Sequence, residues 1–486
     1  MNRRFPGARV IRPTAPDKAR RPGGIHTGSE IHRAHWVMSR PDHIIENGYI
    51  RIENGMITEV SHINSCSALN SGSGSNSGPY YGSDHGTMVF DHGDGVIMPG
   101  LVNAHLHLEL SALKGRLPFN RGFSFWVREL LKQREHIGEK ILAKHAAEAL
   151  KGLVDSGSLF AAEISTLGIT KDIVKNDEFR GIWFKEMLGS MDSFDSEVFS
   201  GFDGGSDGAH LYEILGKSEA YLKLRCEAGQ GQRPDLPHGS YTGCNHDPGH
   251  SIYREKINSP FQPLCFSLAG HAPHTSSPVL LKEIKRLSAS KGLVFSIHAA
   301  ESEDESEFIT TAKGPWACFL KERGIDFSSW PIPASTPVEY LFRLGLLDPL
   351  TILVHLLNLN KRDLELIADS GAKPVLCPRS NMNLHARLPD IPGFLRMGLK
   401  PALGTDSLAS CDSLSIFDEM AFVAAHFPDI PPHDIITMAT INGASALGME
   451  KTGGSLETGK TGDCIYLPLK TGSSADLLET IVSGSM

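Results

Sequence analysis

The sequence predicts an α/β fold, a closed (β/α)8 barrel of the TIM type. Two observations carry this prediction: short β-like apolar runs alternate with amphipathic helical segments, and eight such runs follow one another from residue 96 onward. Alternation of this kind is typical of a parallel sheet covered by helices, and eight repeats are enough to close the sheet into a barrel. A chain of 486 residues with 40% hydrophobic content can bury such a core without disulfide bonds.

The chain before the barrel changes composition twice. Residues 1–28 are rich in Pro, Arg and Gly and predict a disordered basic arm. From Ala34 onward the pattern alternates, and Asn54-Gly55 separates two strand-like segments, which indicates a hairpin because both turn residues tolerate positive φ. Two Ser/Gly- or Pro/Gly-rich stretches predict loop insertions, at 64–86 and at 228–262.

The eight β-like runs come in the order that a barrel requires. Between them lie clear helical segments, at 124–137, 277–292, 336–348 and 361–371. The runs themselves are 96–107, 159–165, 181–187, 263–274, 292–301, 350–359, 373–381 and 399–407.

Each run opens with apolar residues and closes on a titratable or amide residue. Barrel enzymes carry their chemistry at the C-terminal ends of the strands, whereas the barrel interior is packed with branched side chains. A single histidine at such a place is usually a satisfied core residue, but that explanation is poor for five of them. These strand-end residues are His105, His107, Glu186, His271, His298, His355, Arg379, Asn381 and Asp406.

Four of these residues predict a metal site. His105 and His107 are two residues apart on one strand, so both point the same way. His298 and Asp406 end the fifth and eighth strands, and closure of the barrel brings the eighth strand beside the first. Three imidazoles and one carboxylate suit one divalent ion, zinc as the first expectation and iron also accepted. The alternative is a degenerate site that binds no metal.

Two further residues are candidates for catalysis. A divalent ion in this site would lower the pKa of a bound water toward neutrality and so provide hydroxide. Glu301, three residues past His298, can move a proton from that water to a leaving group. His355, at the end of the sixth strand, can hydrogen-bond the hydroxide and stabilise developing charge. The sequence therefore predicts a metal-dependent hydrolytic reaction.

Net charge and cysteine usage limit the kinds of partner and the cellular compartment that the sequence predicts. A net charge of −9 argues against nucleic-acid binding, which needs a basic surface, and no run of about 18 apolar residues predicts a membrane span. The eight cysteines form no C-x-x-C pair, and the basic N-terminus lacks the apolar core of an export signal. We therefore expect a cytoplasmic protein with a small-molecule partner and with neither nucleic acid nor membrane as a partner.

Seven motifs, spread in order from about residue 34 to 468, resemble those of the metal-dependent amidohydrolase superfamily, in its atrazine/triazine-hydrolase-like branch of deaminases and chlorohydrolases. The motifs are PGLVNAHLHLE, HAPHTSS, HAAES, LVHLLNL, CPRSN, LGTDSLAS and the tail that begins ATINGASALG. The resemblance implies a small β-sandwich domain from both ends of the chain (29–97 and 449–486) beside a barrel over 98–448. It also implies the same ligands and catalytic residues, assigns His271 to substrate contact, and suggests a homo-oligomer.

Two residues bear on the substrate. Glu109, on the same face as His107, could accept hydrogen bonds from sugar hydroxyls or serve as a structural partner for a rim cation. Arg379 could clamp a substrate carboxylate or pair with an acidic loop residue. The phrases AHLHLELSALKG and STPVEYLFRLGLLDPLTILVH are similar to aminodeoxyfutalosine deaminases of menaquinone biosynthesis, whose substrate carries adenine, ribose and a benzoate carboxylate.

The expectation is therefore deamination of an amino-purine nucleoside or related heterocycle. Other hydrolases of the same scaffold remain alternatives, among them adenosylhomocysteine, guanine and cytosine deaminases and aryl-chloride hydrolases. A catalytically silent scaffold protein is a further alternative. The chain departs from the resemblance at His274, where a tyrosine is usual, and at Asn358, where a second histidine is common; the fourth strand offers no lysine for a two-metal site.

Overall fold

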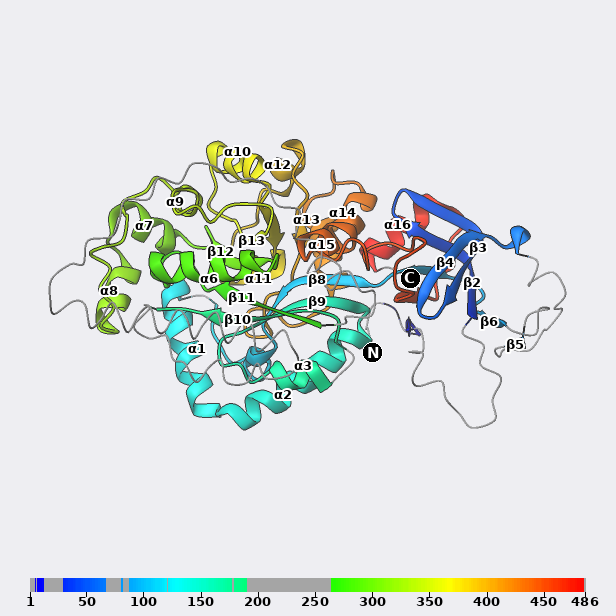
Figure 1. Cartoon of the computed structure of the whole chain (residues 1–486), viewed down its shortest axis with the longest axis horizontal. Helices are drawn as coiled ribbons and strands as arrows, with labels where there is room; N and C mark the ends of the chain where they lie inside the picture. Colours follow the sequence, from blue (N-terminus) through cyan, green and yellow to red (C-terminus); the bar gives the residue numbers. More distant parts are fainter. Residues whose placement is uncertain are drawn as a thin grey trace, which may run out of the picture.

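Two β-sheets organise the molecule; in Figure 1 one lies near the middle of the view and the other at the right. The computed structural model describes residue 5 and residues 7–12, 29–66, 80–81, 87–119, 121–176, 179–189 and 264–484. The insertion predicted over 228–262 therefore lies outside the described residues, as do most of the arm 1–28 and most of the insertion 64–86.

Eight strands between residues 101 and 403 form one parallel sheet. Its strands pair in the unbroken order β8 to β15, and a parallel bridge between Leu106 and Asp406 joins the last strand to the first. The prediction of a TIM-type barrel is therefore confirmed. The strands are β8 (Leu101–Leu106), β9 (Ser158–Ser165), β10 (Gly181–Met187), β11 (Leu264–Gly270), β12 (Phe295–Ala299), β13 (Thr351–His355), β14 (Lys373–Leu376) and β15 (Ala402–Leu403).

Helices surround this barrel in Figure 1, and the four helical segments expected from the sequence are present as α1, α6, α9 and α10. Their apolar faces pack on the strands because buried positions recur three and four residues apart, as at Leu142, Ala146, Leu150 and Leu153 of α2. The helices are α1 (Phe123–Ile137), α2 (Glu139–Asp155), α3 (Lys171–Asn176), α6 (Pro278–Ser290), α7 (Glu303–Thr311), α8 (Pro315–Glu322), α9 (Pro337–Arg343), α10 (Lys361–Ser370), α11 (Pro378–His385), α12 (Ile391–Arg396), α13 (Ile416–His426), α14 (Pro432–Ala439), α15 (Ile441–Ala446) and α16 (Ser474–Ser483).

None of the helices in the described part of the chain combines the length and the hydropathy that crossing a membrane requires.

The second sheet, sheet A, takes strands from both ends of the chain. Its central path runs β1-β16-β7-β2-β3-β4, and the β2–β3–β4 meander turns at Asn54, which has φ 51° as the hairpin signal requires. The boundaries expected for a separate β domain stay predictions. The strands are β1 (Arg9–Ile11), β2 (Ser29–Arg40), β3 (His43–Glu53), β4 (Met56–His62), β5 (Tyr80–Tyr81), β6 (Thr87–Asp91), β7 (Val96–Pro99) and β16 (Cys464–Leu467).

Two features of the N-terminal half differ from the sequence-based expectation. Residues 9–11, assigned to a disordered arm, form β1 and pair antiparallel with β16, and Phe5 is buried edge-on against Phe417 with ring centroids 4.7 Å apart. The run 96–107 is two strands, since β7 pairs in sheet A and only β8 enters the barrel. Gly100 separates them, and a Cβ there would lie 2.7 Å from the Leu159 side chain.

Candidate metal and catalytic site

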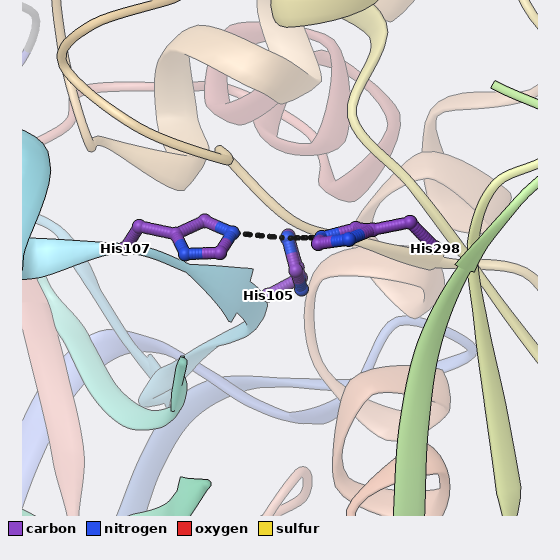
Figure 2. Close-up of side chains that lie close together, drawn as sticks. All are labelled: His105, His107 and His298. Atoms are coloured by element: carbon purple, nitrogen blue, oxygen red, sulfur yellow. Dashed lines mark hydrogen bonds between the residues drawn. The ribbon is translucent and has the colours of Figure 1, made fainter. Parts of the chain in front are cut away.

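Three histidines from two barrel strands converge on one point (Figure 2). The Nε2 atoms of His105 and His107 are 3.2 Å apart, and the Nε2 atoms of His105 and His298 are also 3.2 Å apart. Two nitrogens bound to one tetrahedral zinc at about 2.0–2.1 Å would be about 3.3 Å apart. The observed separations therefore fit three imidazoles that share one divalent ion.

The surroundings of His105 and His298 favour the neutral imidazole, which is the form that binds a metal. Burial, with added repulsion from His107 and His298, lowers the pKa of His105 well below its usual value. His298 is shifted the same way, mainly by burial, to a pKa of about 3. All three side chains are less than one tenth exposed, so a cation here would be shielded from solvent.

Asp406 lies beside the three histidines and is held in place by hydroxyl groups. Its Oδ1 atom is 3.8 Å from Nε2 of His107 and 4.0 Å from Nε2 of His105. Its Oδ2 atom accepts hydrogen bonds from Ser380 Oγ at 2.6 Å and Ser410 Oγ at 2.7 Å. The structure thus brings together the four residues expected to bind the metal, with one carboxylate oxygen turned toward the imidazoles.

Glu301 occupies the adjacent position, between two further imidazoles. Its Oε1 atom is 3.7 Å from Nε2 of His355 and 3.3 Å from Nε2 of His385. Burial alone would raise the pKa of Glu301, but His355 and the hydrogen bond with His385 outweigh it and hold the pKa well below its usual value. The carboxylate is therefore ionised near neutral pH, as a group that accepts a proton must be.

A hydrogen bond to Nδ1 of His355 determines which ring nitrogen of this residue carries the proton. Asn381 donates a hydrogen bond from Nδ2 to Nδ1 of His355 at 3.0 Å, so the ring proton resides on Nε2. That N–H is on the side of Glu301. His385 could not be identified from the sequence, because it is the last residue of α11 (Pro378–His385), well past the end of β14, and has no strand-end position to mark it.

His271 and Glu186 lie on the other side of His298. Oε1 of Glu186 is 3.8 Å from Nδ1 of His298, and Nδ1 of His271 is 2.6 Å from Thr275 Oγ1. Burial alone would raise the pKa of Glu186, but the neighbouring histidines, His271 foremost, outweigh it and lower the pKa to about 2. Both residues line the same cavity as the metal-binding candidates.

Most of the residues described above line one cavity. Its polar wall contains His107, His271, His298, Glu301, His355 and Asp406. Its apolar lining comes largely from α1, including Phe123, Trp126 and Leu130. The arrangement can hold an apolar ring against α1 while the ring's polar edge faces the metal-binding candidates and the proton-transfer candidates.

The structure places Glu109 away from the cavity, contrary to the expectation of a sugar contact. It is 0% exposed and does not line the cavity. Its carboxylate accepts hydrogen bonds from Ser165 Oγ at 2.8 Å, the backbone N–H of Thr166 at 3.0 Å and that of Leu167 at 3.1 Å. These donors saturate its oxygens, so its surroundings support a structural role.

Arg379 is also placed away from the expected substrate contact. Its guanidinium pairs with Asp412, donates to the Ser413 carbonyl at 3.2 Å and lies 3.6 Å from Oε1 of the buried Glu419. It lines a separate, larger cavity together with Leu408 and Asp418. The alternative of an acidic loop partner fits this position, because the side chain turns away from the histidines.

The comparison with protein families identifies the class of this site. Residues 253–486 match the Amidohydrolase family model, and this stretch includes His298, Glu301, His355 and Asp406. The C-terminal part of the chain is therefore similar to the amidohydrolase family, and the matched stretch contains the barrel strands β11 to β15.

Among the relatives is an aminodeoxyfutalosine deaminase from Deinococcus radiodurans, 28% identical over 73% of this chain and 73% of that protein. A 5-methylthioadenosine/S-adenosylhomocysteine deaminase from Nitratidesulfovibrio vulgaris is 27% identical over 88% of this chain and 80% of that protein. The solved aminofutalosine deaminase of Helicobacter pylori, in complex with methylthio-coformycin, superposes with a TM-score of 0.68 at 21% identity, over 93% of this chain and 96% of that one. This superposition shows the shared fold.

Proposed function

We propose that this protein is a metal-dependent hydrolase of carbon–nitrogen bonds that deaminates an amino-purine nucleoside or a related heterocycle. The observation that carries the proposal is the convergence of three histidines and Asp406 beside a cavity that Glu301 and His355 also line. The names of the relatives support an adenine-containing substrate.

The ligands of the proposed ion are His105, His107, His298 and Asp406. Their nitrogen and carboxylate donors suit zinc best, and ferrous iron accepts the same set. When bound, a divalent ion would make a water molecule nucleophilic near neutral pH. Ser380 and Ser410 support this site by fixing Oδ2 of Asp406.

Glu301 is the proposed proton-transfer residue. The oxygen of water adds to the ring carbon that carries the amino group, and Glu301 accepts a proton from that water. The carbon–nitrogen bond then breaks, and the same carboxyl group delivers that proton to the departing nitrogen, so that ammonia leaves. The proton left on the added hydroxyl moves to the adjacent ring nitrogen, and a ring carbonyl remains. His355, with its N–H on the side of Glu301, stabilises the negative charge that develops on the attacking oxygen.

His271 is proposed to contact the substrate ring. It lies in the cavity beside His298, with ring centroids 5.1 Å apart, and its Nδ1 atom is engaged by Thr275. Nε2 is therefore the ring nitrogen available to a heterocycle held over the metal site.

The test is release of ammonia by zinc-loaded protein from adenosine, 5-methylthioadenosine, S-adenosylhomocysteine and aminodeoxyfutalosine. We expect turnover of at least one of them, and a loss of about 10²- to 10⁴-fold in kcat for Glu301→Gln. Glu303→Gln is the matched control, because Glu303 is an exposed acid two residues away whose nearest cation is Arg387 at 3.9 Å.

Three outcomes would contradict the proposal. Purified protein without stoichiometric metal would favour a silent scaffold. Release of chloride from a chlorotriazine, with no ammonia from the adenine compounds, would favour an aryl-chloride hydrolase. Undiminished activity in Glu301→Gln, with Glu303→Gln equally active, would remove Glu301 from the mechanism.

A further inference from the structure

The turn that carries Glu301 begins in a strained conformation. Glu301 is the second residue past β12, and Ala300, which separates it from the strand, has φ 52°. A residue other than glycine enters this left-handed region only at a cost in free energy, so the contacts of the turn must hold it there. A relaxed turn would carry the Glu301 carboxylate away from His355 and His385.

The carbonyl side of this turn is held by the neighbouring strand. The carbonyl oxygen of Ala300 accepts hydrogen bonds from the backbone N–H of Leu357 at 2.9 Å and from that of Asn358 at 2.8 Å. Both donors follow β13, the strand that ends at His355. These bonds fix Ala300 relative to His355, but the N–H groups of Ala300 and Glu301 still need acceptors.

Glu305 satisfies both of these N–H groups with one side chain. Its Oε1 atom accepts from the N–H of Ala300 at 3.0 Å, and its Oε2 atom accepts from the N–H of Glu301 at 2.8 Å. Burial raises the pKa of Glu305 to about 8, and a protonated carboxyl group keeps acceptor capacity on its oxygens. Glu305 is 0% exposed, so its carboxyl group is shielded from water that would compete for these bonds.

The position of Glu305 on α7 ties the helix to the turn. Ser302 is the N-cap of α7, and its Oγ atom accepts a hydrogen bond from the N–H of Glu305 at 3.1 Å. An acidic side chain three residues past the N-cap usually reaches back to the N–H of the N-cap residue itself. Here the carboxyl group reaches the two residues that precede the N-cap, so α7 holds the turn directly.

We propose that Glu305 is a positioning residue for Glu301. By engaging both N–H groups of the strained turn, it keeps the Glu301 carboxylate between its two imidazole partners. This inference rests on the proposed function, because it assigns Glu305 to the proton-transfer step. His298, the metal-binding candidate on the same strand, is held separately, since its N–H donates to the carbonyl of His271 at 3.0 Å. Loss of the Glu305 carboxyl group should therefore slow the chemical step and leave metal binding intact.

The first experiment replaces Glu305 by Gln in the zinc-loaded protein. The amide retains one acceptor oxygen and directs an NH2 group at the other N–H of the turn. We expect kcat for the adenine compounds that the wild type deaminates to fall about 10²-fold, the cost of misplacing a reacting group by about 1 Å. KM and the affinity for zinc in chelator competition should not change. Glu307→Gln is the matched control, because Glu307 is an exposed acid on the same helix.

A second variant separates positioning from general destabilisation. Glycine adopts positive φ without a penalty, so Ala300→Gly removes the strain that Glu305 opposes. The loss in kcat caused by Glu305→Gln should therefore be smaller in the Ala300→Gly background. A role of Glu305 confined to the stability of α7 would give the same loss in both backgrounds, and that result would refute the inference.

Amide hydrogen exchange of a peptide that contains residues 299–302 tests the restraint without any substrate. We expect faster exchange in Glu305→Gln than in the wild type or in Glu307→Gln. Unchanged exchange, an unchanged kcat, or a fall in zinc affinity as large as the fall in kcat would overturn the inference and leave the proposed function intact. If the wild type deaminates none of the compounds, the proposed function fails, and the exchange measurement alone decides whether Glu305 holds the turn.

Discussion

Replacing Glu109 by Gln should destabilise the protein and leave KM for the substrate unchanged. Gln retains one acceptor oxygen, and its NH2 group would face the two donors that now reach Oε2, Ser165 Oγ and the N–H of Leu167. Leaving a buried donor without an acceptor costs about 1–3 kcal/mol. We therefore expect a loss of about 3 kcal/mol in the free energy of unfolding.

The shift in melting temperature follows from chain length. An unfolding entropy of about 2.1 cal/mol/K per residue gives about 1 kcal/mol/K for a chain of 486 residues. A loss of about 3 kcal/mol should therefore lower Tm by about 3 °C, measured by scanning calorimetry. The control is Glu135→Gln, because Glu135 is an exposed acid in the last turn of α1, and this variant should leave Tm unchanged.

The two roles once open for Glu109 predict opposite results. If Glu109 contacted the sugar of the substrate, Glu109→Gln would raise KM for adenosine and leave Tm within 1 °C of wild type, about the spread expected for an exposed substitution. That result would refute the structural role assigned from its three hydrogen bonds.

Three further predictions follow from buried contacts. Ser410→Ala removes one donor to Asp406 and should weaken zinc binding about 10- to 100-fold, measured by chelator competition. Burial raises the pKa of Glu305 from 4.5 to about 8, so the folded protein keeps this proton over a pH range in which the unfolded chain loses it. The contribution to stability is therefore complete below pH 4.5 and declines as pH rises to about 8; Glu305→Gln should flatten the stability profile over that range in urea unfolding, and an unchanged profile would contradict this. Arg379→Met should leave KM for adenosine unchanged and lower stability by about 1–2 kcal/mol, since the contacts of the guanidinium with Asp412 and the Ser413 carbonyl are lost; a raised KM would restore Arg379 to the substrate site.

The barrel and the gathering of its strand-end residues could be predicted because both follow from short-range pattern. A parallel strand covered by helices is apolar on both faces, so its end is marked where the first titratable residue appears, as at His298 and His355. Parallel strands in one barrel end at the same side, and that topology alone brings His105 and Asp406 together.

The partners of individual polar side chains could not be predicted in this way. Glu109 and Arg379 have the residue types of substrate contacts, but the orientation of each depends on hydrogen-bond partners from other elements. These are the N–H of Thr166, which donates to Glu109, and the carbonyl of Ser413, which accepts from Arg379. The contribution of α1 to the cavity could not be predicted either. This helix is amphipathic, and an apolar stripe of this kind is typical of core packing, so only the structure shows that the stripe borders a cavity.

The same topology explains a cluster of unusual backbone conformations at the site. Among the described residues, four of the non-glycine residues with positive φ lie just past strand ends around the cavity: Ala300 (52°), His355 (76°), Leu356 (55°) and Asp406 (60°). Such conformations cost about 1–3 kcal/mol each, so the surrounding contacts must hold them.

Backbone hydrogen bonds between neighbouring strands supply that restraint. The N–H of Asp406 donates to the carbonyl of His105 and its carbonyl accepts from His107, both at 3.1 Å, so the carboxylate is locked in register with the two histidines. The N–H of Leu356 donates to the carbonyl of Ala299 at 3.1 Å, which ties the end of β13 to β12, the strand of His298. The strained turns therefore fix the metal-binding and proton-transfer residues relative to one another through the barrel itself. This accounts for a site whose members come from strands far apart in the sequence, with Asp406 Oδ1 still only 3.8 Å from Nε2 of His107.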